Sequence, residues 1–174
     1  MDSLFIFCGQ YLYLLVFLIA FWFFIKQPLQ TKINIVFIGF FCALLSYLVA
    51  LLAGHLYYNP RPFVEGHFTP LIAHDTENGF PSDHVLMISV ISIVIFIFNK
   101  GYGALTFLVT LIVAYARVYV GVHHYIDVVA SILITWVVTF LFYLIYQRHL
   151  FDKFLGNIYT RLKNFEEKNN LFNR

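Results

Sequence analysis

Charged residues are scarce in this chain. Asp, Glu, Lys and Arg make up 11% of its 174 residues, whereas a soluble domain has about 25%. Cysteine is also nearly absent, and Cys8 and Cys42 both sit in apolar runs. This excludes a disulfide framework and a CxxC metal site, and we interpret both cysteines as small core residues. The first apolar run is not typical of a cleavable signal, because Asp2 is the only charge before it.

Apolar residues dominate the composition instead. They make up 61% of the chain, including 21 Phe, so the sequence indicates an integral membrane protein with no nucleic-acid partner. We predict an all-α bundle of about five transmembrane helices, each needing roughly 20 apolar residues. The third run is shorter and would need its polar start in a headgroup-level or water-filled recess. The five runs are 3–25, 33–57, 84–99, 103–120 and 125–147.

The chain divides into a transmembrane domain, residues 1–147, and a tail, residues 148–174. In the tail, apolar residues recur at helical spacing among charges, a pattern that predicts an amphipathic helix on the inner membrane surface. A partly disordered, solvated tail is the alternative. The apolar residues of this pattern are Phe151, Phe154, Leu155, Ile158, Leu162 and Phe165.

Lysine and arginine are unevenly distributed. If five spans alternate in direction, nine of the 11 fall on one side, and the positive-inside rule makes that side cytoplasmic. The N-terminus is then outside and the C-terminus inside. Arg61 and Arg117 remain for the outer side, with the long connection 58–83 and the short connection 120–125. The nine are Lys26, Lys32, Lys100, Arg148, Lys153, Arg161, Lys163, Lys168 and Arg174.

Polar clusters mark this outer side. One of them, "ARVYVGVHHYIDV", contains Arg117, His123 and Asp127. His123 and Asp127 are four residues apart, so on a helix they share a face. A carboxylate fixes the tautomer of an imidazole and makes its other nitrogen a better nucleophile or ligand. Gly121 offers a break, so Arg117 can end one span while His123 begins the next.

A second cluster, "FPSDH", opens an apolar run. Pro81 suits the first turn of a helix, and free backbone N–H groups near Asp83 would form an anion site. Ser82 adds a hydroxyl donor, and His84 adds a group that titrates near neutral pH. Together with Arg61 of "GHLYYNPRPF", these residues favour a strong anion, and phosphate fits best because arginine binds its oxygens bidentately.

Each of these residues also has an ordinary interpretation. The arginines can snorkel to the interface, His84 or Asp83 can cap a helix, and His123 with Asp127 can form a structural pair or share a metal ion. Two adjacent guanidinium groups argue against a cation. We interpret other histidines as loop residues or neighbours of the site: His67, His74 and His124.

The joint pattern resembles the type 2 phosphatidic acid phosphatase family of membrane lipid phosphatases, to which vanadium haloperoxidases are distantly related. The family has Lys, six residues, Arg-Pro; then Pro-Ser-Gly-His; then Ser-Arg, five residues, His, three residues, Asp. The resemblance covers residues 54–128 and is strongest to the bacterial undecaprenyl-diphosphate phosphatases. The matching residues are Arg61-Pro62, Pro81-Ser82-Asp83-His84, Arg117, His123 and Asp127.

The chain departs from the family at several positions. Gly54 stands where the family has Lys, with His55 one position later, so His55 is a candidate accessory residue, as is Pro81. Asp83 replaces Gly, and Ala116 replaces Ser, which removes one hydroxyl donor. The family core usually has six transmembrane helices, so a bundle of five to six is implied.

The resemblance also implies a mechanism. His123, oriented by Asp127, attacks phosphorus to give a phosphohistidine, while His84 protonates the leaving oxygen and later activates water. No metal or other cofactor is implied, because guanidinium groups supply the charge stabilisation. The phosphoryl oxygens would be held by Arg61, Arg117, Ser82 and the backbone near Asp83.

The expected function is hydrolysis of undecaprenyl diphosphate to undecaprenyl phosphate at the outer face of a bacterial plasma membrane. The expected partners are the bilayer and a polyprenyl or other lipid phosphate. Alternatives are a phosphatase of phosphatidylglycerol phosphate or lipid A 1-phosphate, a non-catalytic transporter of lipid phosphates or anions, and a metal-ion carrier. The sequence leaves open the lipid tail, the choice between mono- and diphosphate, and the oligomeric state.

Overall fold

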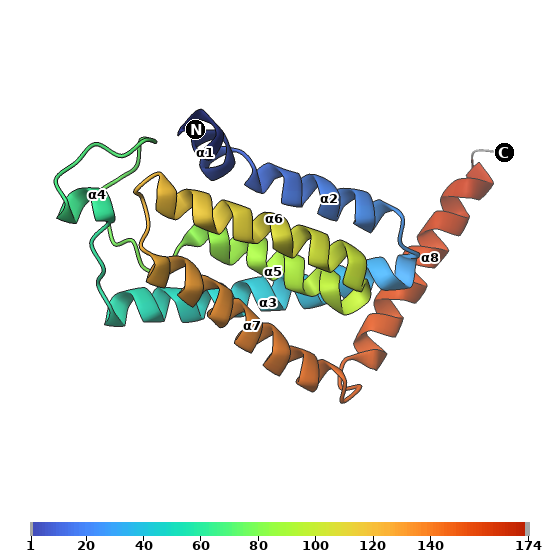
Figure 1. Ribbon diagram of the computed structural model, residues 1–174. Coiled ribbons are helices and arrows are strands. Elements are labelled where there is room, and N and C mark those ends of the chain that lie inside the picture. The colour runs from blue at the N-terminus through green and yellow to red at the C-terminus, as the bar shows by residue number, and fades with distance from the viewer. Residues whose placement is uncertain (1, 173–174) are drawn as a thin grey trace.

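The computed structural model describes residues 2–172, and these form helices and connecting loops without a strand (Figure 1). The all-α prediction is therefore confirmed. Arg174, which counted toward the predicted charge asymmetry, lies outside the described residues. The helices are α1 Asp2–Gln10, α2 Tyr13–Ile25, α3 Leu29–Leu56, α4 Pro62–Glu65, α5 Asp83–Phe98, α6 Lys100–Tyr119, α7 Tyr125–Tyr146 and α8 Asp152–Phe172.

All five predicted apolar runs are helical. The helices α3, α6 and α7 are long and apolar enough to cross a membrane. The first run is a pair, α1 and α2, bent by 47° and together long enough for a fourth span. The third run is α5, which is apolar but has only 16 residues. Residues 2–172 thus contain three to four candidate membrane spans and the shorter apolar helix α5, and they contain no sixth apolar helix of comparable length.

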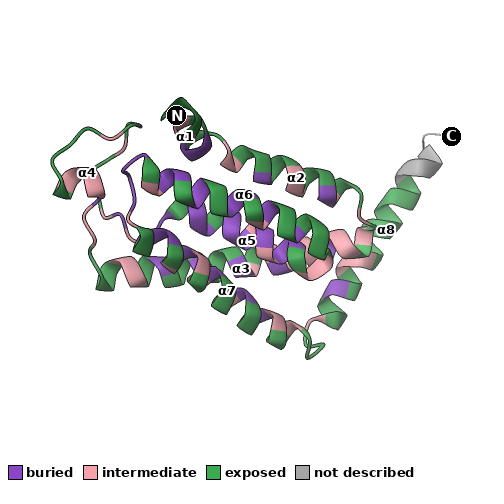
Figure 2. Ribbon diagram, in the orientation of Figure 1, coloured by how far each residue is buried: buried purple, intermediate pink, exposed green. Residues whose placement is uncertain are grey.

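The helix α5 lies at the centre of the bundle and packs against α2, α3, α6 and α7 (Figure 1). Its buried positions run along most of its length, as the purple ribbon in Figure 2 shows. Small hydroxyl residues let the helices approach closely; the hydroxyls of Ser92 on α5 and Thr110 on α6 are 3.1 Å apart. The short helix α5 is held in place because four other helices pack around it.

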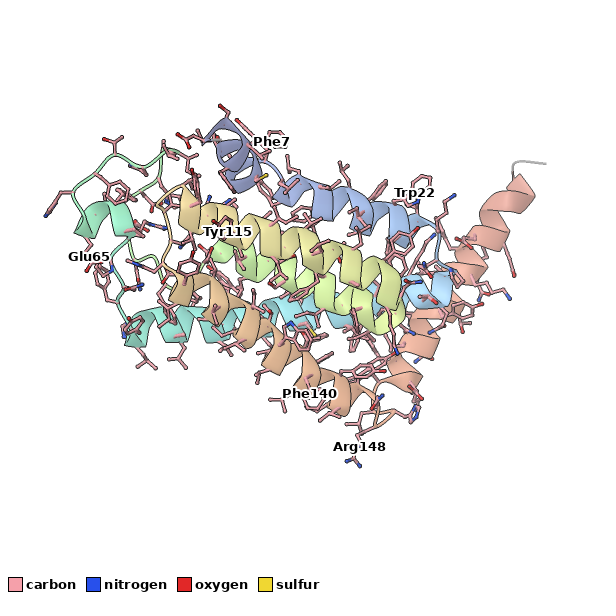
Figure 3. All side chains as sticks on the ribbon, in the orientation of Figure 1. Phe7, Trp22, Glu65, Tyr115, Phe140 and Arg148 are labelled. Atoms are coloured by element: carbon pink, nitrogen blue, oxygen red, sulfur yellow. The ribbon has the colours of Figure 1, made fainter. Side chains whose placement is uncertain are left out.

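The outside of the bundle is apolar. Phe7, Trp22, Tyr115 and Phe140 point away from the helices into the surroundings (Figure 3) and are at least half exposed. A soluble protein rarely exposes a continuous apolar surface, whereas a lipid-facing surface has no cost for doing so. The burial pattern therefore agrees with a multi-pass membrane protein.

The predicted tail forms the helix α8, which packs across α3 at one end of the bundle (Figure 1). Leu155 is buried in this contact, while Phe154 and Phe165 remain exposed among charged residues. The helical part of the tail prediction thus agrees with the structure. Its amphipathic pattern suits a helix on a membrane surface, and its cytoplasmic position stays a prediction.

At the opposite end from α8, the loops gather the polar residues. The end of α3, the short helix α4, the start of α5 and the α6–α7 turn meet there (Figure 1). Glu65 lies at this end and Arg148 at the other (Figure 3). The clusters that the sequence spreads over residues 59–127 are therefore brought into one region.

Asn78 connects the loop between α4 and α5 to the end of α3 by hydrogen bonds. Its side-chain oxygen accepts hydrogen bonds from the backbone N–H groups of Asn59 and Phe80, at 2.9 and 3.0 Å. Its amide nitrogen donates to the carbonyls of Gly54 and Tyr57, at 2.8 and 3.2 Å. All of the amide's hydrogen-bonding groups are therefore used.

We expect Asn78→Ala to destabilise the protein by about 1–3 kcal/mol, because it leaves partly buried backbone groups without partners. The measurement is the melting temperature in detergent, with Glu77→Ala as the control, since Glu77 is exposed in the same loop. Equal melting temperatures for the two variants would show that the Asn78 hydrogen bonds contribute nothing to stability.

Candidate active site

His123 lies at the centre of the cluster and is buried, with 3% of its surface exposed. It follows Gly121, whose φ of 83° turns the chain between α6 and α7 as the sequence predicted. We expected His123 and Asp127 to share a helical face, but His123 precedes Tyr125, the first helical residue of α7, so that expectation was wrong. The two side chains nevertheless meet, with His123 Nδ1 3.4 Å from Asp127 Oδ2.

The hydrogen bonds of His123 fix its tautomer. Nδ1 lies 3.0 Å from the carbonyl oxygen of Gly79, which only accepts, so Nδ1 carries the hydrogen. Nε2 lies 3.4 Å from Arg61 Nη1 and 3.4 Å from Arg117 Nη2, which only donate. The lone pair of Nε2 is therefore directed at two guanidinium groups, where a bound anion would meet it.

Asp127 is fully buried and held by neutral donors. Asn59 Nδ2 donates to Oδ1 at 2.7 Å, and the backbone N–H of His124 donates to Oδ2 at 2.8 Å. The second bond places Asp127 as the capping carboxylate at the start of α7. A Cβ added to Gly79 would lie 3.3 Å from Asp127 Oδ2, so the loop approaches this carboxylate closely.

The two arginines are both buried. Arg61 donates to the carbonyl of Val122 at 3.1 Å, and Arg117 lies 3.4 Å from the carbonyl of Gly9 in α1. Three buried donors of the cluster have no protein partner: Arg61 Nε, Arg117 Nε and the hydroxyl of Ser82. Buried polar groups are normally paired, so these unpaired donors indicate a place for an acceptor-rich ligand.

The start of α5 differs in detail from the prediction. The helix begins at Asp83 with Ser82 as its N-cap, so Pro81 lies before the cap and not in the first turn. Asp83 is exposed and lines an apolar cavity between α2, α3 and α5. His84 is half-buried, touches the ring of Tyr13 edge-on, and lines a second, polar cavity.

The polar cavity has a volume of about 440 Å³ and brings together residues from four parts of the chain. His84 and Arg117 were predicted site residues. His74 and Asp75 were missed: His74 was interpreted as a loop histidine, yet its Nε2 is 2.8 Å from Arg117 Nη2. Asp75 Oδ1 accepts from Arg61 Nη2 at 3.2 Å. The remaining lining residues are Gln10, Ile72 and Ala73.

The structure does not bring His55 to the cluster. His55 is exposed on α3 and has no hydrogen bond to the site within the described residues. The lysine position of the family is also closed, because a Cβ on Gly54 would lie 2.8 Å from the carbonyl oxygen of Phe80. His124 is a neighbour of the site, as predicted, with Nε2 3.1 Å from the carbonyl of Pro60 and 3.4 Å from Glu65.

Comparison with known proteins decides the family. The PAP2 superfamily pattern matches residues 34–151, which include every predicted site residue. The chain belongs to the PAP2 superfamily. Undecaprenyl-diphosphatase BcrC of Bacillus subtilis is 30% identical over 149 residues, covering 82% of this chain and 74% of the relative. Bacitracin transport permease protein BcrC of Bacillus licheniformis is 37% identical over 82 residues, covering 47% and 40%. No solved structure matches the chain.

Membership of this superfamily and the similarity to an undecaprenyl-diphosphatase indicate a lipid phosphatase. Like the departure at Gly54, the departure at Ala116 has a structural explanation. Ala116 is fully buried beside α1, and its carbonyl group lies 3.6 Å from a Cβ placed on Gly9. The space next to residue 116 is thus filled by α1.

His123 titrates in an unusual environment. Burial lowers its pKa, and Arg117 and Arg61 lower it further, while the interaction with Asp127 raises it. The imidazole therefore stays neutral at pH values somewhat below the ordinary histidine pKa of roughly 6.5. A neutral imidazole with a free Nε2 lone pair is the form that can attack phosphorus.

The acidic limb of kcat/KM should accordingly lie below pH 6.5, because activity is lost as His123 becomes protonated. In Asp127→Asn the interaction that raises the pKa of His123 is lost, so in the residual activity this limb should move to still lower pH. The measurement is the pH profile of both proteins on one substrate, so that ionisation of the substrate cancels. A limb that moves to higher pH would contradict the assignment.

Proposed function

We propose that this protein hydrolyses a polyprenyl diphosphate, such as undecaprenyl diphosphate, through a phosphohistidine on His123 and without a metal ion. The observation that carries the proposal is the direction of His123 Nε2, whose lone pair faces Arg61 and Arg117 at 3.4 Å each. The name of the Bacillus subtilis relative supports the choice of substrate.

In the first step His123 Nε2 attacks the terminal phosphorus, forming an N–P bond as the P–O bond to the lipid phosphate breaks. Gly79 and Asp127 hold the Nδ1 hydrogen and stabilise the positive charge on the ring. The guanidinium groups and the Ser82 hydroxyl bind the phosphoryl oxygens, whose charge shifts in the transition state. Among these donors, Arg61 Nε, Arg117 Nε and the Ser82 hydroxyl have no protein partner.

His84 is the acid and base in this proposal. It lines the polar cavity beside Arg117, and it forms no hydrogen bond within residues 2–172 that would occupy its ring nitrogens. It gives a proton to the leaving oxygen and then takes one from the water that attacks the phosphohistidine. Inorganic phosphate leaves, and His123 returns to its neutral form.

A lipid substrate also needs room for its tail. An apolar cavity of about 660 Å³ between α2, α3 and α5 has Asp83, next to His84, as its charged lining residue. Its walls are otherwise mainly Phe, Ile, Leu and Val side chains of these helices. An acyl or prenyl chain can lie there while its headgroup reaches the polar cavity.

The direct test is phosphate release from a panel of purified lipid mono- and diphosphates, in detergent with EDTA. We expect release from polyprenyl diphosphates in the presence of the chelator. Release that requires an added metal would overturn the metal-free mechanism. The transport name of the Bacillus licheniformis relative favours one rival, a non-catalytic carrier, and that rival predicts movement of lipid phosphate across vesicles without release of inorganic phosphate.

The orientation in the membrane gives a further prediction. Within the described residues, the lysines and the arginines other than Arg61 and Arg117 lie at the end of the bundle opposite the cluster (Figure 1). We therefore propose that the cluster faces the outside of a bacterial plasma membrane and α8 the cytoplasm. A cysteine at Thr76 or Glu77, both exposed, should react with an impermeant thiol reagent on intact cells or spheroplasts. A cysteine at exposed Asn157 serves as the control and should react only after permeabilisation; the opposite labelling pattern would invert the topology.

A further inference from the structure

His74 and Asp75 form a second histidine–carboxylate pair beside the catalytic one. They lie in the loop between α4 and α5, away from the motifs that match the family. His74 Nδ1 is 3.2 Å from Asp75 Oδ1, and the ring of His74 is 6.0 Å from the ring of His123 between centroids. The mechanism above uses neither residue, although each of them contacts one of the arginines.

The contacts of His74 determine its protonation state. Arg117 can only donate, so His74 Nε2 accepts the 2.8 Å hydrogen bond. Nδ1 then carries the hydrogen and donates it to Asp75. Burial lowers the pKa of His74, and Arg61 and Arg117 lower it further, although Asp75 opposes them. Without a ligand, His74 is therefore neutral and its Nε2 is held by Arg117.

The polar cavity is lined by polar groups that the attack on one phosphorus does not use. A phosphoryl group on His123 would be held by Arg61, Arg117 and Ser82, and His123 itself does not line the cavity. The cavity wall still offers His74 on the loop and His84 on α5. These two histidines come from different elements and face the same space, which a second phosphate of the substrate would occupy.

We propose that His74, oriented by Asp75, binds the phosphate that leaves with the lipid and so makes the enzyme prefer diphosphates to monophosphates. This inference rests on the proposed function. The occupant is defined by its chemistry: a phosphate joined by an anhydride bond to the phosphate that His123 attacks.

Substrate binding changes the partner of His74. A phosphate that takes the N–H groups of Arg117 releases His74 Nε2. This nitrogen then takes up a proton from the bulk solvent, keeps it, and donates a hydrogen bond through it to the second phosphate. The Asp75 carboxylate stabilises the resulting charge on the ring. The other charged or titratable groups near His74 are Arg61, Arg117, His84 and His123, and the substrate's negative charge offsets the positive ones.

The test compares kcat/KM for farnesyl diphosphate and farnesyl monophosphate, both in detergent with EDTA. In His74→Ala the ratio of diphosphate to monophosphate kcat/KM should fall by about tenfold to hundredfold, the loss of a hydrogen bond to a charged group. His74→Gln keeps an acceptor for Arg117 but cannot carry a charge, so it should lose the preference as well. Glu77→Gln removes a charge from the same loop without reaching the cavity and should keep the wild-type ratio.

Each result has a defined meaning. Equal losses on both substrates would show that His74 only positions Arg117, and that result overturns the inference, as does an unchanged ratio. Residual monophosphate hydrolysis by His74→Ala shows that the variant is folded. If the wild-type protein hydrolyses neither lipid, the proposed function fails, and the inference fails with it.

Discussion

Replacing His123 by alanine should abolish turnover, with a loss on the order of 10⁴-fold or more, as for other catalytic groups that act as a unit. The variant lacks the nitrogen whose lone pair faces Arg61 and Arg117, so no covalent intermediate can form. The His84→Ala variant should fail differently. It keeps the nucleophile but lacks the acid that protonates the leaving oxygen and the base that activates water.

The difference becomes visible with an activated aryl phosphate, whose leaving group needs little protonation. His84→Ala should be phosphorylated by this compound and then stall. The measurement is acid-labile phosphate on the protein after rapid quenching, mapped by mass spectrometry. His67→Asn is the matched control, because His67 is exposed in the loop between α4 and α5 and its φ of 51° suits asparagine.

Two outcomes would contradict these roles. Phosphate trapped on His84 would show that His84 is the nucleophile, so the roles assigned to the two histidines would be reversed. Full turnover by His123→Ala would remove His123 from the chemistry altogether. Normal activity of the His67→Asn control is needed for either comparison, because it shows that a histidine can be replaced near this end of the bundle without general damage.

The helices could be predicted from the sequence because their signal is local. A run of apolar residues long enough to cross a bilayer must satisfy its own backbone hydrogen bonds, so it becomes a helix. The five runs are helical for this reason. The bend between α1 and α2 was not predicted, since neither a proline nor a charged residue marks the break at Tyr11 and Leu12.

The residues that match the family motifs could also be predicted, and the structure brings Arg61, Arg117 and Asp127 each close to His123. The residues that hold these side chains in position could not be predicted. Asn59 reaches Asp127 across 68 positions of sequence, and no spacing rule links the two.

Gly79 and His74 were missed for the same reason. The carbonyl of Gly79 orients His123, but a carbonyl has no signature in a sequence. His74 looked like an ordinary loop histidine, and only the path of the loop brings it against Arg117. The dipeptide His74-Asp75, lying between two motifs that both supply site residues, was the one available signal.

Arg61→Lys should lower kcat/KM by about 10²–10³-fold, the cost of losing one preorganised donor to a transition-state oxygen. Arg61 is buried, and its guanidinium group donates hydrogen bonds in two directions. Nη1 donates to the carbonyl of Val122 at 3.1 Å, and Nη2 donates to Asp75 at 3.2 Å. A lysine ammonium is a point charge on a flexible stem and cannot reproduce this planar fork.

The charge is the same in Arg61→Lys, so a large loss would be due to geometry and not to net electrostatics. The matched control is Arg148→Lys, an exposed position at the far end of the bundle (Figure 3), which should retain wild-type activity. Single-turnover and steady-state rates should be measured together. We expect kcat to fall along with kcat/KM, because the guanidinium acts on charge that develops in the transition state. Near-normal kcat/KM in Arg61→Lys would show that the guanidinium fork does not hold the reacting phosphate.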